Sequence, residues 1–276
     1  MRKAPSLWIR IPLYIAIIVI MLLVNLPFIW MLVTAFKDES EVFTLPPKFY
    51  PNFFDFRNFA GAMAQIPMGR YLFNSLFVAL SVTLLQLLFN SFAAYGLSRL
   101  RFKGRDFIFL ILVGTLMVPP EVTLVPLYII VKNLGMIDSY RVLIIPFMSS
   151  AFGIFLLRQF FLGIPRELEE AAIIDGAGHL KIFLTIILPL TKPALWTMSL
   201  FTFIAHWNEY MWPLVSVSDP KYQMIQVGIS QFVSGWETRW TYRMAASTLV
   251  VVPIIIFFFF VQKQFVEGIS VSGIKE

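Results

Sequence analysis

The chain has 276 residues, of which 58% are hydrophobic and 14% are charged, and phenylalanine alone occurs 29 times. Soluble domains have about half apolar and about a quarter charged residues, and so few polar residues could not cover a soluble core. The composition therefore predicts an integral membrane protein and excludes disordered, collagen-like and nucleic-acid-binding chains. We attribute the net charge of +6 to basic cytoplasmic loops, and the lack of cysteine excludes disulfides and thiolate metal sites.

Six stretches are apolar over the roughly 20 residues that a helix needs to cross the bilayer. They cover residues 11–36, 72–98, 107–131, 142–161, 193–215 and 244–265. The first stretch is longer than the apolar part of a signal peptide, and no clear cleavage site follows it, so we expect it to be retained. The sequence thus predicts an all-α, polytopic membrane protein with residues 1–276 in a single transmembrane domain.

The basic residues predict the orientation of these spans. The short turn 98–106 contains four basic residues, and the N-terminus begins with Arg2 and Lys3. Basic residues concentrate in cytoplasmic loops. We therefore expect this turn and both termini to be cytoplasmic.

The outward loop 216–243 is rich in aromatic residues, including Trp236, Trp240 and Tyr242. Aromatic side chains favour the membrane–water interface, which is one explanation for them. The alternative explanation is that this loop contacts a soluble partner.

Sequence patterns for catalysis are missing from the chain. It contains no G-x-x-x-x-G-K-[ST] loop for ATP, and His179 and His206 lie too far apart to read as a metal-binding pair. The patterns G-x-S-x-G and H-E-x-x-H do not occur either. An enzyme is not expected. The remaining classes are a channel, a secondary transporter, a receptor, and the membrane part of a pump whose ATPase is another polypeptide.

The longest cytoplasmic loop, 158–192, is predicted to contain a short helix. Pro165 can start it, and Glu167, Glu169 and Glu170 suit the positive end of the helix dipole. Four residues at i, i+3, i+4 and i+7 are expected to share one face of this helix, namely Leu168, Ala171, Ala172 and Asp175.

A turn and a second helix are predicted to follow. Gly176 and Gly178 permit a sharp turn, and the amphipathic stretch 180–187 is expected to end at Pro189. This helix–turn–helix over 163–190 is either a docking element for a soluble partner or a plain interfacial helix that covers the bundle.

Several motifs together resemble one family. The signature E-A-A-x(3)-G-x(9)-I-x-L-P is matched in full by Glu170, Ala171, Ala172, Gly176, Ile186, Leu188 and Pro189. It resembles the EAA loop of bacterial ATP-binding-cassette importer permeases. Residues 98–104, 207–214 and 268–275 resemble motifs of the maltose-type carbohydrate importers, the last one a tail of their second permease subunit. Residues 118–138 and 155–175 also look like the subgroup that includes glycerol-3-phosphate importers.

The resemblance implies a set of partners. The helix with the E-A-A triplet would sit in a groove on a partner ATPase, with contact residues Glu170, Ala171, Ala172 and Gly176, flanked by Glu169 and Asp175. ATP and Mg would be bound by two copies of that cytoplasmic ATPase, with no cofactor in this chain. A second, related permease subunit would complete a heterodimer in the lipid of the bacterial inner membrane. An extracytoplasmic solute-binding protein would deliver the cargo.

Polar residues inside spans are costly, and by default they face a cavity or another helix. Candidates for a substrate path are Gln86, Asn90, Glu121, Trp207, Asn208, Glu209 and Tyr210. The structural alternative is that the Asn and Gln side chains only join helices. The sequence as a whole indicates a permease subunit that imports a sugar or oligosaccharide. The alternatives are import of glycerol-3-phosphate or a related phosphodiester by the same machinery, a secondary transporter or channel working alone, and a membrane-anchored scaffold.

Overall fold

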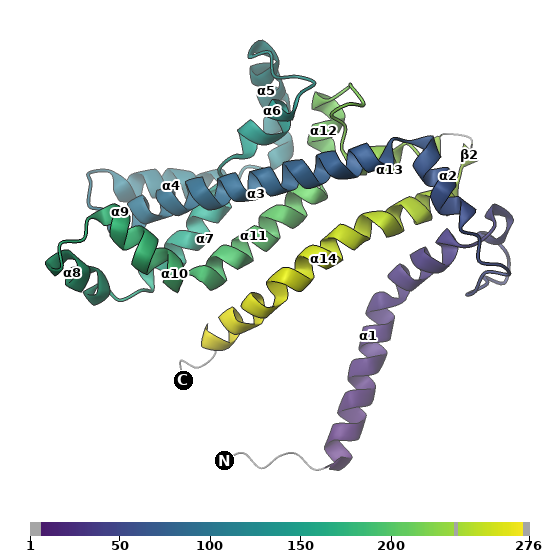
Figure 1. The fold of residues 1–276 in the computed structure, drawn as a ribbon, viewed down its shortest axis with the longest axis horizontal. Coiled ribbons are helices and arrows are strands. Elements are labelled where there is room, and N and C mark those ends of the chain that lie inside the picture. The colour runs from purple at the N-terminus through teal and green to yellow at the C-terminus, as the bar shows by residue number, and fades with distance from the viewer. Residues whose placement is uncertain (1–6, 235–236, 273–276) are drawn as a thin grey trace. The chain divides into compact units, whose positions relative to one another are not determined.

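The computed structural model describes residues 7–234 and 237–272 (Figure 1). The chain forms two compact units. One comprises Met1–Met68 and Ile229–Val252, and the other comprises Gly69–Gly228 and Pro253–Glu276. Nearly all of the regular structure in the described residues is helical, which confirms the predicted all-α class.

The first unit contains one long helix, several short elements and the start of a second long helix, and side chains cap some of the helix ends. Its elements are α1 (Leu7–Ala35), η1 (Glu39–Glu41), α2 (Arg57–Gln65), the antiparallel two-residue strands β1 (Val233–Ser234) and β2 (Glu237–Thr238), and the start of α14 (Trp240–Ser272). The Glu39 carboxylate accepts hydrogen bonds from the N–H groups of Trp240 and Thr241, at 2.8 and 3.1 Å. The Asn58 amide donates to the carbonyl of Ala35, the last residue of α1, at 3.0 Å. Side chains therefore satisfy the backbone groups that helix ends leave free.

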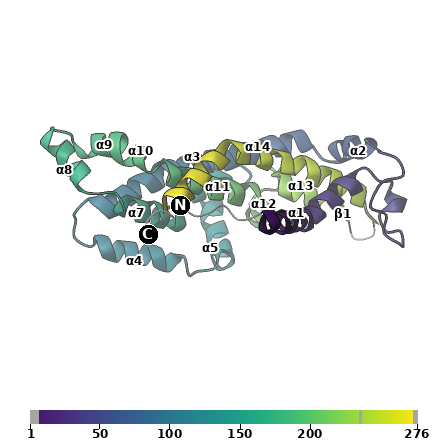
Figure 2. The ribbon, with the colours of Figure 1, turned by 90° about the horizontal axis from the view of Figure 1, so that it is seen from below.

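The second unit is built on the long helix α3 (Met68–Arg99). The elements that follow are α4 (Arg105–Thr115), α5 (Pro120–Asn133), α6 (Tyr140–Ile144), η2 (Ile145–Phe147), α7 (Ala151–Leu162), α8 (Glu167–Ile174), α9 (His179–Ile182), the π-helical η3 (Phe183–Ile187), α10 (Leu188–Leu190), α11 (Lys192–Trp207), α12 (Met211–Ser216) and α13 (Ile225–Ser230). The stretch from α8 to α10 lies at one end of this unit in both ribbon views (Figures 1 and 2).

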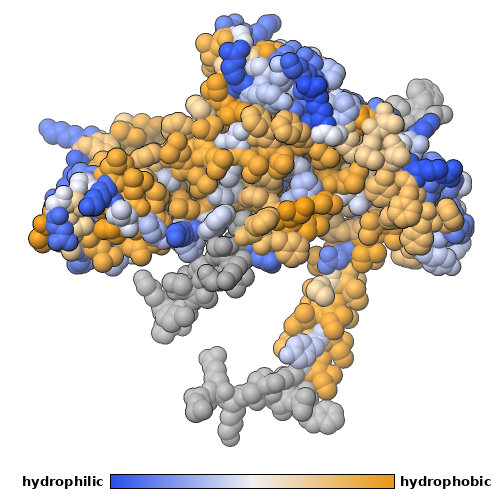
Figure 3. Space-filling model, in the orientation of Figure 1, coloured by the Kyte–Doolittle hydropathy of each residue, from blue (hydrophilic) through white to orange (hydrophobic). Residues whose placement is uncertain are grey.

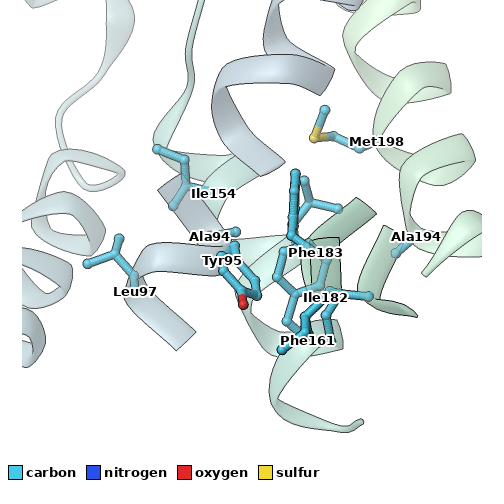
Figure 4. Close-up of a cluster of buried hydrophobic side chains, with 11 residues drawn as sticks. Ala94, Tyr95, Leu97, Ile154, Phe161, Ile182, Phe183, Ala194 and Met198 are labelled. Atoms are coloured by element: carbon cyan, nitrogen blue, oxygen red, sulfur yellow. The ribbon is translucent and has the colours of Figure 1, made fainter. Parts of the chain in front are cut away.

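Two buried clusters hold the second unit together. The larger cluster joins α3, α7, α9–η3 and α11, with Leu157, Phe161 and Phe183 among its buried side chains (Figure 4). The other cluster gathers around Trp212, whose indole N–H donates to the carbonyl of Val142 at 3.0 Å. The larger cluster therefore connects the membrane helices to the stretch from α8 to α10.

Among the described residues, four helices are long and apolar enough to cross a membrane. They are Ile11–Ala35, Met68–Arg99, Tyr140–Leu162 and Trp240–Phe260. Two further candidates are bent helix pairs, and counting each as one span gives six. Apolar surface covers much of the helices in the space-filling view, as expected for a protein surrounded by lipid (Figure 3).

The third predicted span, 107–131, is not one continuous helix. α4 ends at Thr115 and α5 begins at Pro120, and the two helices are bent by 102°. Pro119 and Pro120 cannot donate backbone hydrogen bonds, and Pro119 disfavours a helical conformation in the residue before it. Pro120 instead occupies the start of the new helix, where its missing N–H is not needed.

The fifth predicted span, 193–215, is also broken, because α11 ends at Trp207 and α12 starts at Met211. Pro213 has no N–H to offer the carbonyl of Glu209, so α11 cannot continue unchanged through it. The Glu209 carboxylate instead accepts the N–H of Trp212, at 3.1 Å, in the first turn of α12.

Pro189 does not end the second helix of the loop, contrary to the prediction. That helix continues to Leu190, and its turn Phe183–Ile187 is π-helical. The wider turn lies directly before Pro189, where an α-helix would need the N–H that proline lacks. The pair His179–Leu190 and Lys192–Trp207 is bent by 77°.

Candidate functional site

Residues 163–190, which we call the EAA segment, fold into a helix, a tight turn and a second helix, as the sequence predicts. In the first turn of α8, the N–H groups of Glu169 and Glu170 both donate to the carbonyl of Arg166, at 2.9 and 3.0 Å. Glu167 begins the helix, so three carboxylates lie at its positive end. The local sequence is thus sufficient to explain where α8 starts.

Gly176 terminates α8. Its φ is +79°, its N–H donates to the carbonyl of Ile173, and the N–H of Ala177 donates to the carbonyl of Ala172, both at 2.9 Å. This pair of bonds is a Schellman motif, which needs a left-handed residue after the helix. Gly178 has φ −76° and ψ 164°, an extended conformation that any residue adopts. Only one of the two predicted turn glycines is therefore required by the backbone.

One side of α8 is accessible along its whole length. Glu170, Ala171 and Ile174, which we call the exposed ridge, are all exposed, and Ile174 is 85% exposed. Ala172 is one of the expected contact residues, but it is half-buried and packs against the larger buried cluster. The exposed ridge therefore presents a carboxylate, an alanine and a large apolar side chain on one accessible side of α8.

Glu169 faces inward and anchors α8. Its carboxylate lies 3.0 Å from the Arg99 guanidinium, and the two side chains are 13% and 3% exposed. Arg99 also donates to the carbonyl of Phe161 and, at 2.8 Å, to the carbonyl of Ile164. The predicted flanking residue Glu169 thus holds the helix in place. Its partner Arg99 could not be recognised from the sequence, where it is only one of four basic residues in the turn 98–106.

An open hollow of about 540 Å³ lies between the turn after α3 and α8. Arg99, Arg101, Arg166, Glu169 and Glu170 are among the residues that line it. The structure therefore brings the basic turn and the E-A-A helix together, although they are about 70 residues apart in the sequence.

Gln86 and Asn90, two candidates for the substrate path, are buried in a closed hydrogen-bond network. Gln86 donates to the carbonyl of Phe147 at 2.9 Å, and the Asn90 side-chain oxygen accepts the N–H of Ser150 at 3.1 Å. The hydroxyls of Ser150 and Thr202 both donate to the Gln86 side-chain oxygen, at 2.9 and 3.2 Å. These amides satisfy backbone groups at the irregular stretch before α7, which favours the helix-joining interpretation.

The other candidates for the substrate path differ in burial and lie at two different helix breaks. Trp207 is fully buried and stacked on Phe203, and its buried indole N–H finds no hydrogen-bond acceptor among the described residues. Asn208 and Tyr210 are exposed, and half-buried Glu209 caps α12. Glu121 is exposed in the first turn of α5, on a different element. Trp207 to Tyr210 form the break between α11 and α12, whereas Glu121 follows the break between α4 and α5.

The loop residues of the first unit are ordered by aromatic and charged contacts. Trp240 meets Phe43 edge-on, with ring centroids 5.8 Å apart. The Arg57 guanidinium lowers the pKa of the Asp55 carboxyl, to which it donates at 2.8 Å. Trp236 and part of the tail motif 268–275 lie outside the described residues. Trp240 therefore has structural contacts of its own, and these favour neither explanation of the aromatic loop.

The sequence matches a known family profile and several known proteins. A profile described as a binding-protein-dependent transport system inner membrane component matches residues 86–271. A probable ABC transporter permease, YurM of Bacillus subtilis, is 36% identical, and the alignment covers 98% of this chain and 88% of that protein. The sn-glycerol-3-phosphate permease UgpE of Yersinia enterocolitica is 35% identical over 93% of this chain and 94% of its own length. The arabinooligosaccharide permease AraQ of Bacillus subtilis is 33% identical over 100% and 99%.

The fold is similar to that of a solved transporter. A chain from the crystal structure of a bacterial ABC transporter that imports the acidic polysaccharide alginate superposes with a TM-score of 0.82. It is 25% identical in sequence, and the superposition covers 95% of this chain and 99% of that one. The profile match over more than half of the chain, together with full-length relatives above 30% identity, shows that the chain belongs to the family of binding-protein-dependent transport system inner membrane components.

Proposed function

We propose that this permease imports a sugar or an oligosaccharide and that a separate ATPase drives it by engaging the exposed ridge of α8. Members of the family are membrane-embedded transport components rather than enzymes, and they work with an ATPase and a substrate-binding protein. The observation that carries the proposal is the geometry of α8. Its ridge of Glu170, Ala171 and Ile174 is free, while Glu169 and Ala172 on the other side attach it to the membrane helices.

The relatives support a carbohydrate as the cargo. AraQ is named for arabinooligosaccharides, and the solved neighbour imports an acidic polysaccharide. Glycerol-3-phosphate is the second candidate, because UgpE is 35% identical to this chain. Two of the exposed or half-buried candidates for the path, Glu121 and Glu209, are carboxylates. Carboxylates accept hydrogen bonds from sugar hydroxyls and repel a phosphate group, so we favour the sugar.

The assembly that we infer contains this chain, a second related permease subunit and two copies of a cytoplasmic ATPase that binds ATP and Mg. The basic turn after α3 and the exposed ridge of α8 then face the cytoplasm, together with both termini. A substrate-binding protein delivers the cargo at the opposite face. Since ATP hydrolysis takes place on other chains, this chain needs only a contact surface and a path through the membrane.

Photo-cross-linking tests the contact directly. A benzophenone amino acid at Ile174 should cross-link to the co-purified ATPase, whereas the same group at Leu184, which is 50% exposed on η3, should not. An ATPase that co-purifies but fails to cross-link at position 174 would place the contact elsewhere. Active transport by a purified chain with no ATPase attached would favour the stand-alone transporter.

The cognate substrate-binding protein tests the cargo. We expect isothermal titration calorimetry to show binding of arabinotriose or a related oligosaccharide, and no binding of sn-glycerol-3-phosphate. The reverse result would transfer the assignment to the phosphodiester group without changing the role of α8.

A further inference from the structure

One guanidinium joins three elements at the end of the second unit that carries the EAA segment. Arg99 is the last residue of α3, and it reaches the carbonyls of Phe161 and Ile164, which lie at the end of α7 and just beyond it. Its other terminal nitrogen lies 3.0 Å from the carboxylate of Glu169 in the first turn of α8. The Arg99 side chain is 3% exposed and the Glu169 side chain is 13% exposed, so most of this junction is shielded from water.

The chemistry of the junction suits arginine specifically. A guanidinium is planar and presents several donors at fixed angles, so it can hold a carboxylate and two carbonyls at once. It also places positive charge at the negative end of α7, and Glu169 places negative charge at the positive end of α8. A lysine carries the same charge but cannot reproduce this planar arrangement.

Few other contacts attach α8 to the helices. Of its eight residues, Glu167 to Ile174, only Glu169 and Ala172 are turned inward, and the rest are exposed. The chain itself connects α8 to α7 and α9. No such covalent connection leads to α3, because Glu169 lies 70 residues beyond Arg99. A push on α8 therefore reaches α3 chiefly through side-chain contacts, of which this ion pair is the charged one.

We propose that Arg99 is a positioning residue that transmits the movement of α8 to α3, an inference that rests on the proposed contact between α8 and an ATPase. A second bond supports the same connection, since the Tyr95 hydroxyl donates to the carbonyl of His179 at 3.2 Å, at the start of α9. The charged neighbours of the junction are Arg101, Arg166 and Glu170, which line the hollow beside it. They are exposed, so they do not replace a buried pair.

The test follows movement at two points in the complete transporter. Bimane is attached to single cysteines at Ile174→Cys on α8 and Leu84→Cys on α3, in complexes whose other subunits lack reactive cysteines. This chain has no cysteine, and both positions are exposed, at 85% and 64%. The emission change on trapping with ATP and vanadate is measured in lipid nanodiscs, and ATP hydrolysis is measured on the same samples.

With Arg99 in place, nucleotide should change the emission at both positions. In Arg99→Gln the change at position 174 should persist, while the change at position 84 should fall by about fivefold or more, the lower end of typical site-to-site coupling. Glu169→Gln keeps the shape and both carbonyl bonds, so its loss at position 84 should be smaller. Arg101→Gln, which removes the same charge from an exposed side chain two residues away, should behave as the wild type.

Each outcome tests either the role of Arg99 or the proposed contact of α8. An unchanged signal at position 84 in Arg99→Gln overturns the role of Arg99, and so does a wild-type complex that responds at position 174 alone. A wild-type complex that does not respond at position 174 contradicts the proposed contact of α8 itself. If Arg99→Gln does not assemble, Glu169→Gln decides, because full transmission without the carboxylate would exclude the ion pair as the connection.

Discussion

Individual residues fix α8 in two different ways. Gly176 ends the helix through a backbone conformation, whereas Arg99 holds its first turn through a side chain that comes from another helix. The first requirement is local, but the sequence offers two glycines for it, Gly176 and Gly178, and only Gly176 adopts the left-handed conformation. The second depends on two residues 70 positions apart, and only the folded structure brings them together.

Substitutions at Gly176 and Gly178 should separate the effect of backbone strain from the effect of an added side chain. Beyond its chain neighbours, no heavy atom of the described residues lies within 4 Å of a Cβ built at either Gly176 or Gly178, so the described part of the chain does not crowd either site. Gly176→Ala must hold a left-handed conformation, at a cost of about 1–2 kcal/mol. We expect it to lower ATPase recovery in pull-downs of the complex, and Gly176→Asn to be milder because asparagine tolerates that conformation. Gly178→Ala is the matched control, and equal loss at both glycines would refute the argument.

The buried amide network has its own critical residue. A Cβ at Gly153 in α7 would overlap the side-chain nitrogen of Asn90 and approach Ser150 Oγ to 2.9 Å. Gly153→Ala should therefore destabilise the protein by about 1–3 kcal/mol, the usual cost of overpacking. Thermal unfolding in detergent measures it. Gly96→Ala, where the added Cβ meets nothing within 4 Å, should leave the midpoint unchanged or higher. An unaltered midpoint for Gly153→Ala would show that the network can rearrange.

At the scale of elements, the apolar stretches that the sequence predicts as spans are mostly helical, but not all of them are continuous helices. The first, second and last spans are single helices. We attribute this to their sequences, which contain neither two adjacent prolines nor a carboxylate that could cap the start of a new helix. The breaks at Pro119–Pro120 and around Pro213 arise from missing N–H groups, which the sequence displays. The sequence does not show which groups form hydrogen bonds with the backbone groups that the breaks leave free. Gln86 and Asn90 supply such partners from α3, and their sequence context cannot distinguish that role from a substrate path.

The orientation of α8 predicts the reactivity of neighbouring positions. A cysteine at Glu170, on the exposed ridge, should react quickly with an impermeant maleimide, and only in inside-out vesicles. A cysteine at Glu169 should react more slowly from the same side, because that side chain is 13% exposed and faces Arg99. Rapid labelling at position 170 in intact cells would reverse the topology. Faster labelling at position 169 than at 170 would mean that α8 is rotated.

At the scale of the whole molecule, the chain has the parts that a subunit of an ATP-driven importer needs and that a solitary transporter does not. The larger buried cluster connects the EAA segment to three membrane-associated helices, and the ridge of that segment remains uncovered. The chain belongs to a family of inner membrane transport components, and its sequence contains no P-loop pattern. The contact surface that we propose on α8 therefore lies on a different element from the helices that are long enough to cross the membrane.

The most direct measurement is ATP-driven uptake by proteoliposomes that contain the complete transporter, with hydrolysis recorded in parallel. Arabinotriose and sn-glycerol-3-phosphate serve as the labelled solutes. Ile174→Asp adds a charge to the exposed ridge without disturbing a buried contact, since this side chain is 85% exposed. We expect uptake to fall about tenfold or more, within the range of typical coupling energies, while Lys103→Ala on the basic turn transports normally. Wild-type uptake by Ile174→Asp, with the ATPase bound and hydrolysing, would contradict the claim that α8 receives the energy of ATP.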